Sequence, residues 1–90
     1  MDAQQATLLA IKALGYVAAD SERFGKFLAE SGFGAEALRE AAGDPDLLAG
    51  VLDFVLSEDA MVLELCQLLD LPPEAPARAR ANLPGYAPPM

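Results

Sequence analysis

Few side chains in this 90-residue sequence could carry out covalent or metal chemistry. The chain has no histidine and no tryptophan, and Cys66 is its only cysteine. A zinc site usually takes three or four Cys and His ligands, so a conventional one is excluded. No histidine can activate Cys66, and the neighbouring acids Glu64 and Asp70 would disfavour its thiolate. We therefore expect Cys66 to be a buried structural residue, and we expect no metal and no other cofactor.

Carboxylates are the remaining groups that could move a proton. Glu58 and Asp59 are adjacent, and Asp53 lies near the end of the preceding predicted helix. General acid catalysis would require one of them to be desolvated, with a raised pKa. Acids in the first turn of a helix are usually exposed, and the helix dipole lowers their pKa instead. We therefore expect no catalytic residue, no small-molecule substrate and no enzymatic activity. A pocket that holds an acid of raised pKa would revive the alternative of a carboxylate enzyme.

Asp53 lies on a predicted helix that is otherwise almost entirely apolar, and two interpretations of it are open. Its carboxylate faces solvent, or it is buried and paired with Arg23, Lys26 or Arg39 from another helix. In the buried case, Asp53→Ala would leave the cation unpaired and would cost several kcal/mol. A loss below about 0.5 kcal/mol, the usual value for a surface residue, would exclude that case.

Charge is unevenly distributed along the chain. Fourteen acidic and six basic residues give a net charge of −8. Between Arg39 and Arg78 there is no basic residue, and the acids in this stretch are Glu40, Asp44, Asp46, Asp53, Glu58, Asp59, Glu64, Asp70 and Glu74. The basic residues are scattered singly and form no stripe. Because binding to nucleic acids and anionic membranes relies on Lys and Arg, we expect neither as a partner.

Apolar residues recur at steps of three and four along most of the chain, which is the period of an α-helix. In the first predicted helix they are Leu8, Ile11, Leu14 and Val17 or Ala18. The sequence predicts helices over about residues 3–18, 21–31, 35–42, 47–56, 60–69 and 75–83. It shows no strand alternation, no internal repeat and no sustained heptad.

Residues with strong positional preferences mark the ends of these helices. Asp20 is predicted to cap the second helix, and Gly32 to end it in the left-handed conformation. Asp44-Pro45-Asp46 supplies an N-cap, a first helical residue of fixed φ and an acid at the positive helix end. Ser57-Glu58-Asp59 is predicted to cap the next helix. Pro76 fits only in the first turn of the last helix.

The two predicted helices over 47–56 and 60–69 are apolar almost all round, so each should be central or covered by a partner. We expect Leu48, Val51, Leu52, Val55, Met61, Leu65 and Leu68 to form the centre of the core, with Phe24, Phe27 and Leu28 packed against them. Two such helices carry more apolar surface than we expect one small bundle to hide. The surplus would be left for a partner.

These elements predict an all-α protein, a compact orthogonal bundle of five or six short helices. Residues 1–83 are expected to form a single domain, and residues 84–90 a flexible C-terminal tail. Runs without charged or amide side chains, such as residues 13–19, are far shorter than the roughly 20 residues of a transmembrane helix. The first five residues lack the positive region of a secretory signal. A cytoplasmic location is therefore expected.

Over about residues 8–83, the chain resembles a family of short all-helical domains of unknown function from alphaproteobacteria. The segments that carry the resemblance are Ala18-Ala19-Asp20-Ser21-Glu22-Arg23-Phe24, Gly32-Phe33-Gly34, Leu48-Ala49-Gly50-Val51-Leu52-Asp53-Phe54 and Leu71-Pro72-Pro73-Glu74. The resemblance implies a bacterial cytoplasmic protein, and it carries over no catalytic residue.

A second, local resemblance covers residues 24–56. A helix, a Gly-Phe-Gly turn, a short helix and an apolar third helix are similar to the three-helix modules of the ubiquitin-associated type. The resemblance implies that the third helix and the loop aromatic contact a partner, and Phe33 would be that aromatic residue. The alternative is that Phe33 packs into the core.

The sequence thus favours a non-enzymatic protein-interaction or self-associating module, with a protein partner or a second copy of the chain on its surplus apolar surface. The alternative is an acidic regulatory domain that binds a basic partner protein, with an affinity that falls as salt rises. The candidate partner-binding residues are Phe33, Asp53, Glu58 and Asp59.

Overall fold

The computed structural model describes residues 1–34 and 44–83, and in these residues it contains five α-helices and no strand. They are α1 (Ala3–Ala18), α2 (Ser21–Ser31), α3 (Pro45–Leu56), α4 (Asp59–Leu69) and α5 (Ala75–Ala81). The all-α prediction is confirmed, and the predicted bounds of the helices agree with the structure to within about two residues. The predicted helix over 35–42 and the predicted tail over 84–90 lie outside the described residues.

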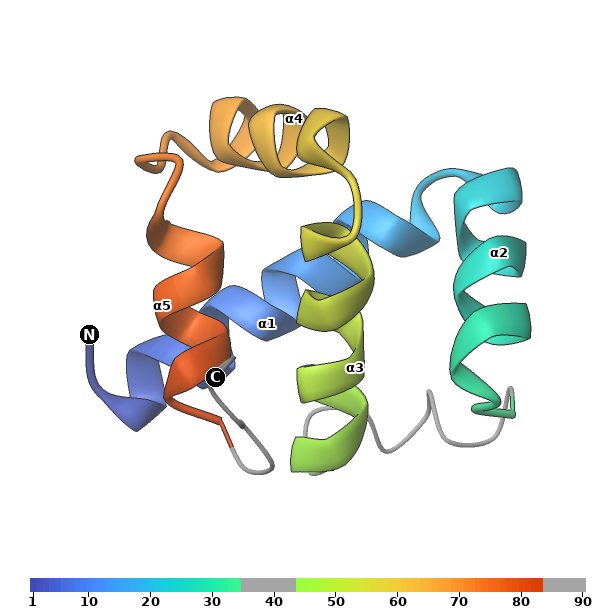
Figure 1. Cartoon of the computed structure of the whole chain (residues 1–90), viewed down its shortest axis with the longest axis horizontal. Coiled ribbons are helices and arrows are strands. Elements are labelled where there is room, and N and C mark those ends of the chain that lie inside the picture. The colour runs from blue at the N-terminus through green and yellow to red at the C-terminus, as the bar shows by residue number, and fades with distance from the viewer. Residues whose placement is uncertain (35–43, 84–90) are drawn as a thin grey trace.

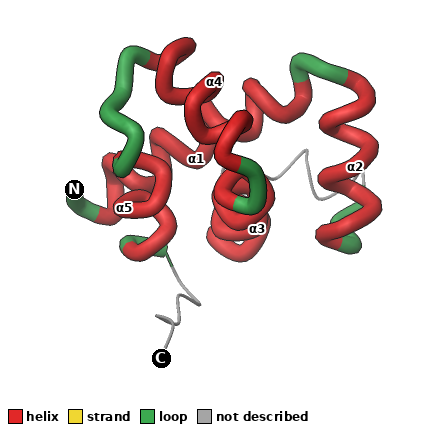
Figure 2. Tube along the Cα trace, turned by 45° about the horizontal axis from the view of Figure 1, so that its top comes forward, coloured by secondary structure: helices red, strands yellow, loops and turns green. Residues whose placement is uncertain are grey.

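Helix α3 lies at the centre of the molecule and contacts each of the other four helices (Figure 1). Helices α2, α3 and α5 stand side by side, with α1 crossing behind α5 and α3 and α4 lying across one end, as the turned view in Figure 2 also shows. Helices α1 and α4 therefore cross their neighbours instead of lying along them, as expected for an orthogonal bundle. None of the helices in residues 1–34 and 44–83 is long and apolar enough to cross a membrane.

Three of the helices begin at aspartates whose side chains accept backbone hydrogen bonds. Asp20 Oδ1 accepts from the N–H groups of Glu22 and Arg23, at 2.9 and 3.2 Å. Asp44 does the same at the start of α3, where the proline occupies the first helical position. In α1, Asp2 and Gln5 form a capping box that the sequence analysis did not identify. These local bonds satisfy N–H groups that the helices themselves leave free.

The predicted ends of the helices are confirmed at two further positions and only in part at a third. Gly32 has φ of 75°, the left-handed conformation predicted at the end of α2, and Pro76 lies in the first turn of α5. The prediction that Ser57-Glu58-Asp59 caps α4 is confirmed for the place where the helix begins and wrong for a side-chain capping bond. The Ser57 hydroxyl instead donates to the carbonyl oxygen of Phe54, at 2.6 Å, and Glu58, at the N-cap position, makes no capping bond with its side chain.

The core consists mainly of the inward faces of α1 and α3 with residues from the other helices. Most of the predicted centre is buried: Leu48, Val51, Leu52, Val55, Met61 and Leu65. Phe27 is fully buried against it, and Phe24 and Leu28 are partly buried. The core also includes a stripe of α1: Ala6, Leu9, Ala10, Ala13, Tyr16 and Val17.

Leu68 is the exception among the predicted core residues, because it is 66% exposed. It lines an open hollow between α4 and α1 whose other lining residues include Gly15 and Ala19. Since a glycine has no side chain and an alanine only a methyl group, α1 offers Leu68 little to pack against at this level. Its position on the apolar stripe of α4 was therefore not enough to bury it.

The expected surplus of apolar surface is absent from α3 and present on α4. Every large apolar residue of α3 except Leu56 is buried, because the helix is surrounded by the rest of the bundle. On α4, by contrast, Leu63 is 54% exposed and Leu68 is also exposed. The expected surplus of exposed apolar surface is therefore found on α4 and not on α3, and its use by a partner stays a prediction.

Candidate functional site

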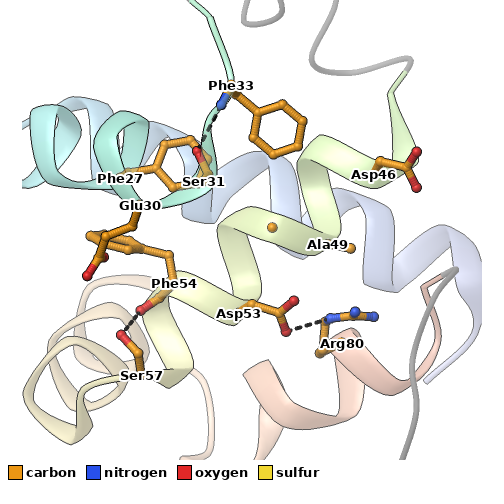
Figure 3. A pocket seen from close by; sticks show the side chains of 11 residues that line it. Phe27, Glu30, Ser31, Phe33, Asp46, Ala49, Asp53, Phe54, Ser57 and Arg80 are labelled. Carbon is orange, nitrogen blue, oxygen red and sulfur yellow. Dashed lines mark hydrogen bonds and ion pairs between the residues drawn. The ribbon is translucent and has the colours of Figure 1, made fainter.

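A hollow of about 480 Å³ opens between α2, α3 and α5 and contains two of the four candidate partner-binding residues, Phe33 and Asp53 (Figure 3). Its lining comprises Phe27, Glu30, Ser31, Phe33, Asp46, Ala49, Gly50, Asp53, Phe54, Ser57 and Arg80. We call this surface the aromatic groove. It combines three phenylalanine rings with three carboxylates and one guanidinium group.

The base of the groove is aromatic. The ring of Phe27 contacts that of Phe54 edge to face, with centroids 5.5 Å apart, and stacks with that of Phe33, with centroids 6.3 Å apart. Phe27 and Phe54 are buried, whereas Phe33 is only partly covered. Such arrangements are favourable beyond the area they bury. Phe33 therefore both packs against the core, as one interpretation of the sequence proposed, and presents part of its ring to the groove.

Gly50 allows the ring of Phe33 to lie directly against α3. A Cβ atom at position 50 would be only 3.0 Å from Cε2 of Phe33. The Phe33 N–H also donates a hydrogen bond to Oγ of Ser31, at 3.3 Å. The end of α2 and the absence of a side chain at position 50 thus together place the Phe33 ring (Figure 3).

Three carboxylates surround the rings. Glu30 projects from α2, Asp46 from the first turn of α3 and Asp53 from a point about two turns further along α3 (Figure 3). Glu30 and Asp46 are exposed to solvent. Among the described lining residues Arg80 is the only cation, so this part of the lining has an excess of negative charge.

The carboxylate of Asp53 faces solvent, which was the first of the two possibilities that the sequence left open. Its side chain is 59% exposed, and Oδ1 lies 2.7 Å from Nε of Arg80 in α5. The alternative, a buried pair with Arg23, Lys26 or Arg39, is wrong. The two described candidates pair elsewhere, Arg23 with Asp20 and Glu64, and Lys26 with Glu58. Arg39 lies outside the described residues.

Glu58 and Asp59 do not belong to the groove. Glu58 Oε1 accepts a hydrogen bond from Nζ of Lys26 at 2.8 Å, and both side chains are about half exposed. This bond raises the pKa of Lys26 above its ordinary value. Asp59 is an exposed acid in the first turn of α4. The structure therefore brings Phe33 and Asp53 together and leaves Glu58 and Asp59 at a separate surface.

A cluster of Tyr16, Arg23 and Glu64 joins α1, α2 and α4. The hydroxyl of Tyr16 donates to Oε1 of Glu64 at 3.0 Å, and the guanidinium of Arg23 lies 3.8 Å from the centre of the tyrosine ring. Burial, and then the hydrogen bond to Glu64, raise the pKa of the Tyr16 hydroxyl. This cluster was not predicted from the sequence. The sequence does give one indication of it, a tyrosine on the apolar face of a helix, because the hydroxyl of a buried tyrosine needs a hydrogen-bond partner.

Cys66 is 5% exposed, as predicted for a structural cysteine. Its Sγ lies 3.5 Å from the carbonyl oxygen of Pro72, and burial raises the pKa of the thiol above its ordinary value. A raised pKa lowers the fraction of thiolate at neutral pH, so the thiol is a poor nucleophile. In the described part of the chain, no three metal-ligating side chains come together.

The family model described as "Protein of unknown function (DUF3572)" matches residues 3–86, nearly the whole chain. The protein belongs to this family. The match confirms the expectation of a short domain family of unknown function. No curated protein and no solved structure matches the chain. The alphaproteobacterial origin and the similarity to ubiquitin-associated modules remain predictions.

Proposed function

We propose that this member of the DUF3572 family is a non-enzymatic protein-interaction module whose aromatic groove binds an amphipathic segment of a basic partner protein. The observation that carries the proposal is the juxtaposition of a partly covered aromatic ring, Phe33, with an uneven set of charges around it. A bacterial, cytoplasmic setting is part of the proposal and is supported by the sequence resemblance.

The aromatic residues would supply most of the affinity. Partner-binding surfaces are enriched in aromatic side chains, and a few anchors near the centre usually dominate the binding free energy. Phe33 can be covered further by a partner because part of its ring is still exposed, and the buried rings of Phe27 and Phe54 hold it from behind. An apolar side chain of the partner would pack on the part of Phe33 that the core leaves uncovered.

The charges would select the partner. Glu30 and Asp46 have no ion-pair partner within residues 1–34 and 44–83, and the chain as a whole carries −8. A basic segment is attracted by both the local and the overall charge, whereas an acidic one is repelled. The groove thus combines the two functions that the sequence favoured, an apolar docking surface and an acidic one.

Titration of the ¹⁵N-labelled protein with a synthetic peptide of Lys-Leu-Leu-Lys repeats tests the proposal by NMR. We expect chemical-shift changes concentrated at Phe33, Gly50 and Asp53, and a dissociation constant that rises with salt. A peptide with Gln in place of Lys should bind far more weakly. Phe33→Ala should also weaken binding, because it removes the partly exposed ring.

A matched pair of double variants separates the groove from general attraction to an acidic protein. Glu30→Gln with Asp46→Asn removes two exposed carboxylates from the groove, and Glu22→Gln with Asp59→Asn removes two exposed carboxylates outside it. We expect the first pair to weaken binding about ten-fold and the second less than about two-fold. Equal effects of the two pairs, or shifts spread evenly over the surface, would contradict the proposal.

A further inference from the structure

A second hollowed surface lies between α1 and α4. It consists of two adjoining hollows, of about 700 and 330 Å³, which share Lys12 and Leu69 in their linings. The large apolar residues that are exposed in the described part of the chain are Met1, Leu8, Leu63 and Leu68. All of these except Leu63 line the two hollows, which we call the α1–α4 face.

The sequence of α1 explains why this face is both apolar and hollow. Leu8, Lys12, Gly15 and Ala19 follow one another at steps of three and four, so they form one outward stripe of the helix. Its last two members are small, and a Cβ atom at Gly15 would have no neighbour within 4 Å. Across this depression α4 presents Leu68, with 66% of its surface exposed. The face therefore offers both a projecting leucine and a space that could receive one.

The charges of the α1–α4 face differ from those of the rest of the molecule. Its lining contains two cations, Lys12 and Arg23, and one anion, Glu64. Lys12 takes part in no ion pair within the described ranges 1–34 and 44–83. The whole chain, by contrast, has fourteen acidic and six basic residues. A second molecule of net charge −8 therefore meets less repulsion at this face than at the acidic aromatic groove.

We propose that the α1–α4 face binds a second copy of this chain and forms a two-fold symmetric dimer. A two-fold interface requires one surface to be complementary to itself. The α1–α4 face meets this requirement in shape, because a projecting leucine lies beside a depression that could receive the leucine of a second copy. It also meets the requirement in charge, because cations and an anion lie on the same face. A basic partner has no reason to prefer a face with two cations over the acidic aromatic groove.

Sedimentation equilibrium over a range of protein concentrations tests this assignment. We expect the wild-type chain to approach twice its monomer mass of 9.4 kDa at a few hundred micromolar. Leu68→Glu should raise the dissociation constant of the dimer at least about ten-fold, since it buries a charge in the interface. Leu8→Glu should act in the same direction. Both residues are exposed in the monomer, so neither substitution removes a core contact.

Leu63→Glu is the matched control. Leu63 lies on the same helix as Leu68 and is 54% exposed, but it does not line the α1–α4 face. The substitution adds the same charge, so general repulsion between acidic chains affects both variants alike. We expect Leu63→Glu to change the dimer dissociation constant less than about two-fold. A wild-type chain that stays monomeric at these concentrations would overturn the proposal, as would equal effects of the Leu63 and Leu68 substitutions.

The dimer and the peptide-binding groove stand on different residues, so each can fail without the other. The aromatic groove is lined by residues of α2, α3 and α5, together with residues that adjoin them, and it shares no residue with the α1–α4 face. Leu68→Glu should therefore leave titration with the Lys-Leu-Leu-Lys peptide unchanged. The double variant Glu30→Gln with Asp46→Asn should sediment with the same dimer dissociation constant as the wild-type chain.

Discussion

Tyr16 shows how a single side chain couples its ionisation to the fold. It is buried in the core, and its hydroxyl donates to Glu64 beside the guanidinium of Arg23. Burial and this hydrogen bond favour the neutral phenol, so its pKa lies above the ordinary value near 10. Stability from a group with a raised pKa is present below the ordinary pKa and is lost as pH rises through the pKa of the folded state.

Tyr16→Phe tests this coupling. At neutral pH we expect it to lower the free energy of unfolding by about 1 kcal/mol, the usual value of one hydrogen bond. Above about pH 10 the wild-type protein should lose stability more steeply than the variant. The Tyr16 hydroxyl ionises more readily in the unfolded wild-type chain than in the folded one, and the phenylalanine of the variant does not ionise. Urea denaturation from pH 8 to pH 11 measures both effects. Cys66 and Lys26 titrate in both proteins, so parallel pH profiles would mean that Tyr16 is not coupled to folding.

At the scale of the helices, two glycines in helix interiors face different surroundings. Gly25 in α2 is exposed, and a Cβ atom there would have no neighbour within 4 Å. Gly50 in α3 lies against Phe33, and a Cβ atom there would be 3.0 Å from the ring. Alanine is favoured over glycine in a helix by about 1 kcal/mol. Only at position 50 does the packing of another segment oppose this preference.

Gly25→Ala should therefore raise the free energy of unfolding by about 0.5–1 kcal/mol, as measured by urea denaturation. Gly50→Ala should gain less than this or lose stability, because the new methyl group must displace the ring of Phe33. In a Phe33→Ala background the obstacle is gone, and Gly50→Ala should recover the gain seen at Gly25. Equal gains at the two positions in the wild-type background would show that the ring of Phe33 is not held against α3.

For the molecule as a whole, the excess of acidic residues causes repulsion that reaches across its full width at low salt. Its principal extents are 29 × 26 × 25 Å. At about 10 mM salt the Debye length is roughly 30 Å, so nearly every acid interacts with every other. At about 150 mM it is roughly 8 Å. In each ion pair of the described residues the carboxylate is about half exposed or more, so water and salt screen the attraction. Repulsion within a chain of charge −8 should therefore outweigh them.

We accordingly expect the midpoint of thermal unfolding to rise by several degrees when NaCl increases from about 10 mM to about 150 mM. Circular dichroism at low micromolar concentration measures this shift. Repeating the measurement with Leu68→Glu separates the effect from self-association, because that variant should unfold as a monomer. A midpoint that falls as salt rises would mean that the surface ion pairs stabilise the fold more than the repulsion destabilises it.

The helices could be predicted from local sequence, because the signals that begin and end a helix act over a few residues. Asp20, Gly32, Asp44 and Pro45 each satisfy or constrain the backbone of their own turn, and the structure confirms all four. Ser57 shows the limit of such signals. Its hydroxyl can bond either the turn before it or the turn after it, and it bonds the carbonyl oxygen of Phe54.

The candidate site could be predicted only in part. The sequence marks Phe33 as the aromatic residue of a Gly-Phe-Gly turn and Asp53 as the one acid on an otherwise apolar predicted helix. That they share a groove depends on how α2 packs beside α3. The partner of Asp53 is Arg80, from a helix 27 residues away in sequence, and no local pattern joins the two. Glu58 and Asp59 lie on another surface, which also follows from the packing of the helices and from no local pattern in the sequence.

The tertiary structure alone decided which apolar residues are covered and which charges meet. α3 and α4 are both largely apolar in sequence, yet α3 is surrounded by other helices while α4 lies across one end of the bundle and leaves Leu63 and Leu68 exposed. Helix formation is set by hydrogen bonds within each turn, so neighbouring residues contain enough information to predict it. Burial is set by the other segments that pack on a helix, and their positions depend on the whole chain.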